Sequence, residues 1–432
     1  MSKTPIPEEI VREQLKISGI QNVSTASIRE MKRLINMIEG ASGVRFVRME
    51  MGIPGLKPVS IGVQAQIEAL QRGVAATYPE IEGLPVLKNE ISRFCKNFIN
   101  IDVDPKGCIP SVGSMQASFA VFLTLPQLHK GKDTTLFIDP GFPVQKSQHH
   151  ILGNKYETFD VYHYRDEALR EKLESYLSKG NIHSIIYSNP NNPSWICFTE
   201  KELRIIAEVA AKYDVIVIED LAYFGMDFRQ DISKPGVPPY QPSIAHYYDK
   251  YILMISGSKA FSYAGERIGA LIIANAIFEQ RYPDLIDRFG TDNLAKAFIF
   301  GTTYCLSSGV AHSVQYAMAA ILKACNDGTY NFVEPLREYE YKAHEMKQMF
   351  VENGFKIVYD HDGDQALADG FYFTIRYPGM SSEELLREFL FYGISAISLK
   401  ITGSDNKDGL RACVSLIQLE ELPVLKEDTF FL

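Results

Sequence analysis

Two stretches decide the fold: Val215-Ile-Val-Ile-Glu-Asp220-Leu-Ala-Tyr223 and Ile252-Leu-Met-Ile-Ser256-Gly-Ser-Lys259-Ala-Phe-Ser-Tyr-Ala-Gly-Glu-Arg267. Each starts with a run of apolar residues, the pattern of a strand that is covered on both faces of a parallel sheet. Each then places ionisable side chains directly after the strand. Parallel strands end at one edge of their sheet, and ligands bind at that edge. The two stretches therefore predict an α/β domain with a site beside its sheet.

Further apolar runs extend this sheet along the chain. The strands that we expect lie at residues 135–139, 184–188, 215–219, 252–256 and 270–274. Helices are expected at 84–98 and 115–123, and another begins after Thr199, which forms a capping box with Glu202. The alternation of strands and helices predicts a mostly parallel central sheet between helices.

The sequence pattern changes near residue 330. A charged helix is expected at 334–352, a further helix at 382–392, and strands at 355–359, 370–377 and 411–416. We therefore expect a large domain over residues 48–329 and a smaller α+β C-terminal domain over 330–432. Residues 1–47 are too few for a domain and are expected to contact the smaller one.

Composition limits the partners and the compartment. The 432 residues include 44 lysines and arginines against 53 aspartates and glutamates, a net charge of −9. This balance argues against nucleic acid or an anionic membrane as the main partner. The six cysteines lack a Cys-x-x-Cys pair, so we expect them to be small core residues in a reducing compartment. Together with a start that lacks an apolar signal segment, they favour a cytoplasmic protein. The pair His149-His150 lacks a metal-site motif, so we expect both at the surface and no metal.

Lys259 is the first candidate for chemistry, because it follows a strand within three residues and has small neighbours. In an apolar setting the pKa of a lysine falls, since desolvation disfavours the ammonium form. The neutral amine can then attack a carbonyl and form a Schiff base. A lysine at the protein surface is the alternative interpretation.

Three other segments carry polar groups at strand or helix ends. A buried carboxylate needs a partner, so Asp220 is suited to a positive pyridinium nitrogen, with the phenol of Tyr223 near a ring oxygen; a helix N-cap is the alternative. Asn192, in Ser188-Asn-Pro-Asn-Asn192-Pro193, forms either an ordinary turn or part of the site. Gly113-Ser114-Met115-Gln116 opens a helix whose first N–H groups suit a phosphate.

In their order along the chain, these segments resemble the class I/II aminotransferase family, whose members are fold-type-I enzymes that depend on pyridoxal 5′-phosphate. The resemblance covers most of the chain. It implies that Lys259 holds the cofactor as a Schiff base and that Asp220 pairs with the pyridine nitrogen. It also implies that Tyr223 and Asn192 contact the ring oxygen. The expected activity is transfer of an amino group between an L-amino acid and a 2-oxo acid.

The resemblance assigns roles to a larger set of residues. Those expected at the cofactor phosphate are Ser114, Met115, Gln116, Ser256 and Arg267. Phe142 is expected to stack on the pyridine ring, and Arg411 to bind the α-carboxylate of the substrate beside Asn192 and Gly52. Tyr78 is expected to reach the cofactor phosphate of the partner subunit in a homodimer with shared active sites.

Two departures and three alternatives accompany this interpretation. Ser194-Trp195 stands where the family has Thr-Gly, which puts the turn geometry in question and sets the only tryptophan where it could narrow the site. Asp220-Leu221 stands where the family has Asp-Glu. A pyridoxal-phosphate-dependent C–S β-lyase or another lyase would share the ring-binding residues. A serine acyltransferase of the penicillin-binding type is suggested by Ser256-Gly-Ser-Lys259 and Ser404-Asp-Asn406. The third alternative is a non-catalytic binding protein or the sensor half of a transcription regulator.

Overall fold

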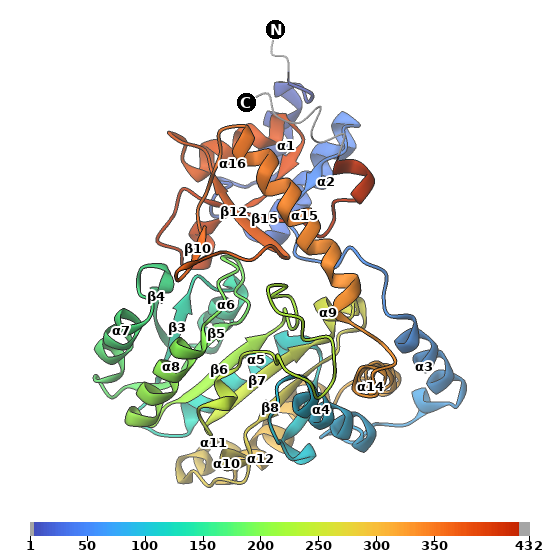
Figure 1. Ribbon diagram of the computed structural model, residues 1–432, viewed down its shortest axis with the longest axis vertical. Helices are drawn as coiled ribbons and strands as arrows, with labels where there is room; N and C mark the ends of the chain where they lie inside the picture. The colour runs from blue at the N-terminus through green and yellow to red at the C-terminus, as the bar shows by residue number, and fades with distance from the viewer. Residues whose placement is uncertain (1–3, 423–432) are drawn as a thin grey trace.

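A seven-stranded sheet in the order β2-β8-β7-β6-β5-β3-β4 forms the centre of the lower half of the molecule in Figure 1, in a computed structural model that describes residues 4–422. The strands are β2 (Cys108–Ser111), β3 (Thr134–Asp139), β4 (Lys155–Asp160), β5 (Ile182–Ser188), β6 (Ile216–Leu221), β7 (Tyr251–Ser256) and β8 (Gly269–Ile273). All five expected strands are present, with ends that shift by no more than two residues. Their side chains are almost all buried, as apolar runs predict for a sheet covered on both faces.

The sheet is not parallel throughout. Strand β8 pairs antiparallel with both of its neighbours, β2 and β7, whereas the pairs among β3, β4, β5, β6 and β7 are parallel. An apolar run does not encode strand direction, so the sequence could not separate β8 from the rest. The reversal matters, because it brings the start of β8 to the edge where the other strands end.

Helices surround this sheet, and several start where the sequence predicted. The main ones are α3 (Ser60–Gln71), α4 (Pro85–Phe98), α5 (Gly113–Thr124), α6 (Pro143–Leu152), α7 (Glu167–Leu177), α8 (Glu200–Tyr213) and α14 (His312–Asn326). The capping box before α8 is confirmed: the Thr199 hydroxyl accepts a hydrogen bond from the Glu202 N–H, and the Glu202 carboxylate accepts one from the Thr199 N–H.

The C-terminal part contains a smaller sheet with the order β14-β15-β12-β9, all antiparallel. Its strands are β9 (Lys356–Ile357), β12 (Tyr372–Arg376), β14 (Ile397–Ser398) and β15 (Leu410–Cys413), with helices α15 (Val333–Glu352) and α16 (Ser382–Phe391). The N-terminal helices α1 (Glu8–Ser18) and α2 (Ile28–Ser42) lie beside it (Figure 1), and β1 (Val47–Arg48) pairs with β13 (Ile394–Ser395). Domain boundaries at residues 47 and 329 stay a prediction.

Two expectations about individual residues are wrong. His149 is buried, and its ring contacts the Gln145 carbonyl at 3.0 Å and the Thr135 hydroxyl at 2.9 Å, whereas only His150 is exposed. Adjacent residues of a helix point in different directions, so in α6 His149 faces the protein interior and His150 faces the solvent. Cys305 is exposed, while the other five cysteines are buried and all six are free. Within residues 4–422 there is no helix that could cross a membrane and no cluster of three or more metal-ligating side chains.

A short hairpin of β10 (His361–Asp362) and β11 (Gln365–Ala366) joins the C-terminal part to the larger sheet through ion pairs. The buried carboxylate of Asp362 lies 2.8 Å from the guanidinium of Arg165 and 2.9 Å from that of Arg229. It also accepts a hydrogen bond from the Cys197 N–H at 3.1 Å. Three segments of the larger part therefore converge on one side chain of the hairpin.

Replacing Asp362 should weaken the connection between the two parts. We expect Asp362→Asn to lower the free energy of unfolding by about 1.5 to 3 kcal/mol, the range of a hydrogen bond to a charged group. The loss is limited because Arg165 keeps its ion pair with Glu202 and Arg229 keeps its ion pair with Asp227. Urea denaturation followed by fluorescence measures the change. The control is Asp364→Asn, at an exposed position of the same hairpin. Equal stability of the two variants would show that the ion pairs do not hold the hairpin.

Candidate active site

The expected site residues converge because of where the strands end. Asn192 follows β5, Asp220 is the next-to-last residue of β6, and Lys259 follows β7 in the short helix α9 (Gly257–Ala260). Asp220 pairs in the sheet with Ser188 on one side and with Met254 on the other. The three strands are adjacent and parallel, so their carboxyl ends bring the asparagine, the aspartate and the lysine to one edge.

The amine of Lys259 lies against backbone and aromatic surface. It donates a hydrogen bond to the carbonyl of Gly52 and lies 5.4 Å from the ring centre of Phe371. Burial lowers the pKa of Lys259 to about 8; the nearby Cys413 thiol opposes this shift, and the guanidinium of Arg411 adds to it. The expected lowering of this pKa is thus present, and a large part of the amine is neutral near pH 8.

The carboxylate of Asp220 is buried without a cation beside it. Its two oxygens accept hydrogen bonds from the Gln145 amide at 3.0 Å and from the Ala222 N–H at 3.1 Å. Burial raises the pKa of Asp220 to about 6, although both hydrogen bonds lower it. No lysine, arginine or histidine in the described part of the chain forms an ion pair with this group. A protonated ring nitrogen from a bound molecule would supply the missing partner.

Arg411 has the geometry of a carboxylate receptor. Its guanidinium donates to the Glu50 carbonyl at 2.7 Å and to the Asn192 side-chain oxygen at 3.3 Å, and it is 1% exposed. Its Nε is buried without a hydrogen-bond partner. A guanidinium binds a carboxylate through two parallel N–H donors, and these contacts leave donors of Arg411 free for that purpose.

The expected phosphate-binding residues occupy the neighbouring strand ends. Gly113 starts helix α5 with a φ of 70°, and a Cβ at this position would lie 2.7 Å from Nη2 of Arg267. The start of α5, with Ser114 in its first turn, and Arg267 therefore form one positive surface. The Ser256 hydroxyl accepts a hydrogen bond from the Ser258 N–H at 3.1 Å.

Met115 and Gln116 lie farther along the first turn of α5. The Gln116 side chain accepts a hydrogen bond from the Val112 N–H at 2.7 Å and donates one to the Ser307 hydroxyl at 2.6 Å. These internal contacts occupy the amide. The two side chains help to line an open hollow of about 340 Å³, whose other lining residues are Val112, Phe119, Gln148, Leu306 and Ser307.

Phe142 and Tyr78 are the least constrained of the expected site residues. Phe142 is half-buried in the turn between β3 and α6, at the same edge of the sheet as Asp220. Tyr78 is 91% exposed and stands apart from the contacts that join the other site residues. Its expected role depends on a second subunit, so the single chain leaves that role a prediction.

The departure at Ser194-Trp195 changes what lies behind the site. Trp195 keeps a left-handed backbone with a φ of 66°, the conformation that favours glycine. Its indole is fully buried, edge-on to Tyr223 and Tyr372 with ring centres 5.4 Å and 6.1 Å away. The space comes from Gly370, where a Cβ would lie 2.2 Å from the indole. The tryptophan therefore supports two tyrosines from behind and does not itself narrow the opening.

Four residues of the site had no sequence signal of their own. They are Gln145 beside Asp220, Glu50 and Tyr372 beside Arg411, and Phe371 beside Lys259. Phe371 and Tyr372 were expected only as part of a strand in the C-terminal part. Glu50 contributes its backbone carbonyl, a group that no residue type encodes.

Comparison with known proteins identifies the family. The sequence profile of "Aminotransferase class I and II" matches residues 50–415, most of the chain. The chain belongs to this family. A probable aspartate aminotransferase of Methanocaldococcus jannaschii is 25% identical over 347 residues, covering 79% of this chain and 80% of that protein. A putative aminotransferase of Bacillus subtilis is 23% identical over 416 residues, covering 93% and 94%.

Solved structures agree on the fold. An alanine aminotransferase from Pyrococcus furiosus superposes with a TM-score of 0.75, at 19% identity over 94% of this chain and 96% of that one. A Thermus thermophilus aspartate aminotransferase variant gives 0.74 at 16% identity, over 96% and 97%. The α/β aminotransferase fold with a smaller C-terminal sheet is thus confirmed. The family assignment confirms the expected class of activity, an aminotransferase that acts on amino acids and 2-oxo acids.

Members of the family use pyridoxal phosphate, and the donor set described here fits that group. The buried carboxylate of Asp220 lacks a cation, Lys259 has a lowered pKa, and Arg411 has an idle buried donor. The serine acyltransferase and the regulator are set aside by the family assignment. The two serine motifs also serve separate contacts, since Ser256 bonds Ser258 whereas Ser404 bonds Tyr359.

The unpaired carboxylate predicts a pH-dependent stability in protein freed of pyridoxal phosphate. Its pKa rises from 3.8 to about 6 on folding, so burial of the charge costs little below pH 4, more as the pH rises from 4 to 6, and its full amount above 6. Asp220→Asn should therefore stabilise the protein by about 2 to 3 kcal/mol at pH 8 and by almost nothing at pH 4.

Urea denaturation at both pH values measures this difference. The exposed Asp408→Asn is the control and should show no such dependence. A gain for Asp220→Asn that is the same at pH 4 and pH 8 would contradict the assigned cause.

Proposed function

We propose that this aminotransferase binds pyridoxal 5′-phosphate covalently through Lys259, with Asp220 beneath the pyridine nitrogen. The observation that carries the proposal is the buried carboxylate of Asp220, which has hydrogen-bond donors but no cation and ends the strand next to Lys259. When bound, the cofactor withdraws electrons from the substrate Cα. Asp220 keeps the ring nitrogen protonated, because an ionised acid already in place stabilises the positive nitrogen.

Lys259 moves the proton in this proposal. As a free amine, its Nζ would take the proton from the substrate Cα and hold it for return. An amine with the usual lysine pKa of about 10.4 would be protonated at neutral pH and could not act as a base. The lowered pKa of Lys259, about 8, brings the amine into the range where a general base works.

The other expected residues orient the two ligands. Arg411 binds the α-carboxylate with Asn192 and the Gly52 segment beside it. The cofactor phosphate is assigned to the start of α5 and nearby side chains, namely Ser114, Met115, Gln116, Ser256 and Arg267. Tyr223 and Asn192 contact the ring oxygen, and Phe142 stacks on the ring. These roles rest on the strand-end geometry and on the family resemblance.

We also propose a homodimer with shared active sites. Large apolar side chains are exposed on two segments of the larger part: Tyr78 is 91% exposed, Phe300 58%, Tyr304 53% and Leu306 38%. The segment of Tyr78 is held to α14, where His312 contacts the Thr77 carbonyl at 3.2 Å. Ser307, next to Leu306, is bonded to Gln116. A second copy that covers this surface would bring Tyr78 toward a phosphate site.

The substrate pair and the reaction outcome need a direct assay. Amino donors are screened with 2-oxoglutarate and pyruvate as acceptors, and the visible spectrum is followed alongside amino-acid and keto-acid products. Amino transfer that depends on the keto acid supports the proposal. Release of pyruvate and ammonia without an acceptor would instead favour the lyase. The cytoplasmic location remains a prediction that fractionation of cells can test.

Lys259→Ala should abolish turnover in this assay while the protein still folds, since no other group supplies the amine. The exposed Lys407→Ala should retain the activity of the parent protein. Circular dichroism and the absorbance band of bound pyridoxal phosphate are recorded for both. Substantial turnover by Lys259→Ala would overturn the assignment of the amine.

The dimer is tested with Phe300→Glu and Tyr304→Glu combined. Two charges in a buried apolar interface oppose association, so we expect a mass near 48.7 kDa for the variant and twice that for the parent. Light scattering coupled to gel filtration gives the mass. Activity should fall together with dimer content if Tyr78 serves the partner's site. A parent protein that is monomeric and fully active would disprove the shared site.

A further inference from the structure

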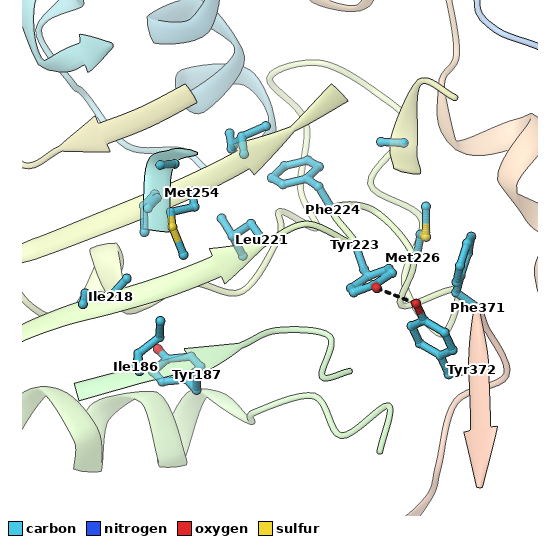
Figure 2. Packing of buried hydrophobic residues seen from close by; sticks show 14 of the residues in the cluster. Ile186, Tyr187, Ile218, Leu221, Tyr223, Phe224, Met226, Met254, Phe371 and Tyr372 are labelled. Atoms are coloured by element: carbon cyan, nitrogen blue, oxygen red, sulfur yellow. Dashed lines mark hydrogen bonds between the residues drawn. The ribbon is translucent and has the colours of Figure 1, made fainter. Parts of the chain in front are cut away.

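A second tyrosine, Tyr372, contacts both halves of the site. It lies on β12 in the C-terminal part, whereas Tyr223 follows β6, and Figure 2 shows the two hydroxyl groups facing each other. Their oxygens are 2.8 Å apart. The centre of the Tyr372 ring is 4.4 Å from the guanidinium carbon of Arg411. Tyr372 thus touches the residue expected at the cofactor ring and the residue expected at the substrate carboxylate.

The position of Tyr372 is fixed on several sides. Its hydroxyl lies so close to Gly52 that a Cβ on that glycine would be 1.9 Å away. The indole of Trp195 meets both tyrosine rings edge-on, and the ring of Phe371 is 5.6 Å from that of Tyr223. Tyr372 is 2% exposed. Neither ring can turn away without displacing a neighbour.

Both phenols carry their hydrogens. Burial raises the pKa of Tyr223 and of Tyr372, so both are protonated at neutral pH. The ionisable groups that act on the pair are Arg411 and Cys413 on β15. Lys259 on α9 contacts the same Gly52 segment as the Tyr372 hydroxyl. Arg411 can only donate.

Within residues 4–422, the hydroxyl of Tyr372 has a single hydrogen-bond partner, Tyr223. If Tyr223 donated, the hydrogen of Tyr372 would be buried without an acceptor, which costs free energy. The hydroxyl of Tyr223 has no other partner in the same residues either, so within the chain alone either phenol can donate. With an acceptor such as the cofactor ring oxygen beside Tyr223, both hydrogens are satisfied only when Tyr372 donates to Tyr223. Tyr223 then keeps its own hydrogen for a ligand in the site.

We propose that Tyr372 is a positioning residue whose hydroxyl strengthens Tyr223 as a donor to the ring oxygen of the cofactor, and whose ring holds Arg411 in place for the substrate carboxylate. Hydrogen bonds in a chain polarise one another, so a phenol that accepts a hydrogen bond donates more strongly. A buried guanidinium over an aromatic face is held electrostatically. The inference rests on the proposed function, because it requires pyridoxal phosphate beside Tyr223.

Two variants separate the two contacts. Tyr372→Phe removes the hydroxyl and keeps the ring, whereas Tyr372→Leu removes both. The first readout is the pH midpoint of the visible absorbance change of protein loaded with pyridoxal phosphate. A weaker donor stabilises an anionic ring oxygen less, so the protonated form persists to higher pH. We expect both variants to raise the midpoint by roughly 0.2 to 0.5 pH unit, because loss of the polarising contact weakens the Tyr223 hydrogen bond by about 10 to 30% without removing it.

The second readout is the affinity for propionate, a carboxylate without an amine. It should be unchanged in Tyr372→Phe and at least about fivefold weaker in Tyr372→Leu, where the aromatic face is lost. Tyr359→Phe is the matched control, because it removes a buried hydroxyl that donates to Asp160 at 2.6 Å and touches neither Tyr223 nor Arg411. This control should move neither readout.

The outcomes separate the proposed function from the role of Tyr372. A parent protein that takes up no pyridoxal phosphate would refute the proposed function. A parent that titrates normally, with an unshifted midpoint in Tyr372→Phe or a shift of equal size in Tyr359→Phe, would refute only the role of Tyr372. Equal propionate affinity in Tyr372→Leu and the parent would refute the contact with Arg411.

Discussion

The site depends on one constraint, the burial of ionisable groups whose counter-charges lie outside the chain. Asp220 is ionised at neutral pH without a cation beside it, and Lys259 is pressed against a carbonyl and an aromatic ring. Both arrangements oppose folding, since desolvation disfavours charge. The rest of the structure compensates through a large buried sheet. Such unsatisfied groups at strand ends are what a charged aromatic ligand would complete.

The sheet positions most of the site residues directly, because they lie at the ends of its strands. The carboxyl ends of five parallel strands place the start of α5, Phe142, Asn192, Asp220 and Lys259 at one edge. The reversed strand β8 delivers Arg267 to the same edge from its beginning. The C-terminal part then covers this edge with Arg411 and Tyr372, and the Asp362 hairpin ties it to the segment after Trp195.

Sequence patterns predicted the parts of this site that occur next to a strand end. Apolar runs predict the strands. Residues at the ends of these runs, such as Asp220 and Lys259, must then lie at the carboxyl edge of the sheet. The patterns could not predict the direction of β8, because strand pairing is a long-range property. They also missed Gln145 and Tyr372, whose roles arise from contacts between segments far apart in the chain. His149 was misplaced for a similar reason: one residue of register on a helix decides burial.

The pairing of Trp195 with Gly370 has an evolutionary consequence. A smaller residue at 195 would leave a void behind two tyrosines, whereas any side chain at 370 would collide with the indole. Neither position can drift alone, so a lineage that acquires the tryptophan must keep the distant glycine. Co-variation of these two columns among relatives would therefore trace a distinct branch of the family, defined by how its aromatic wall is supported.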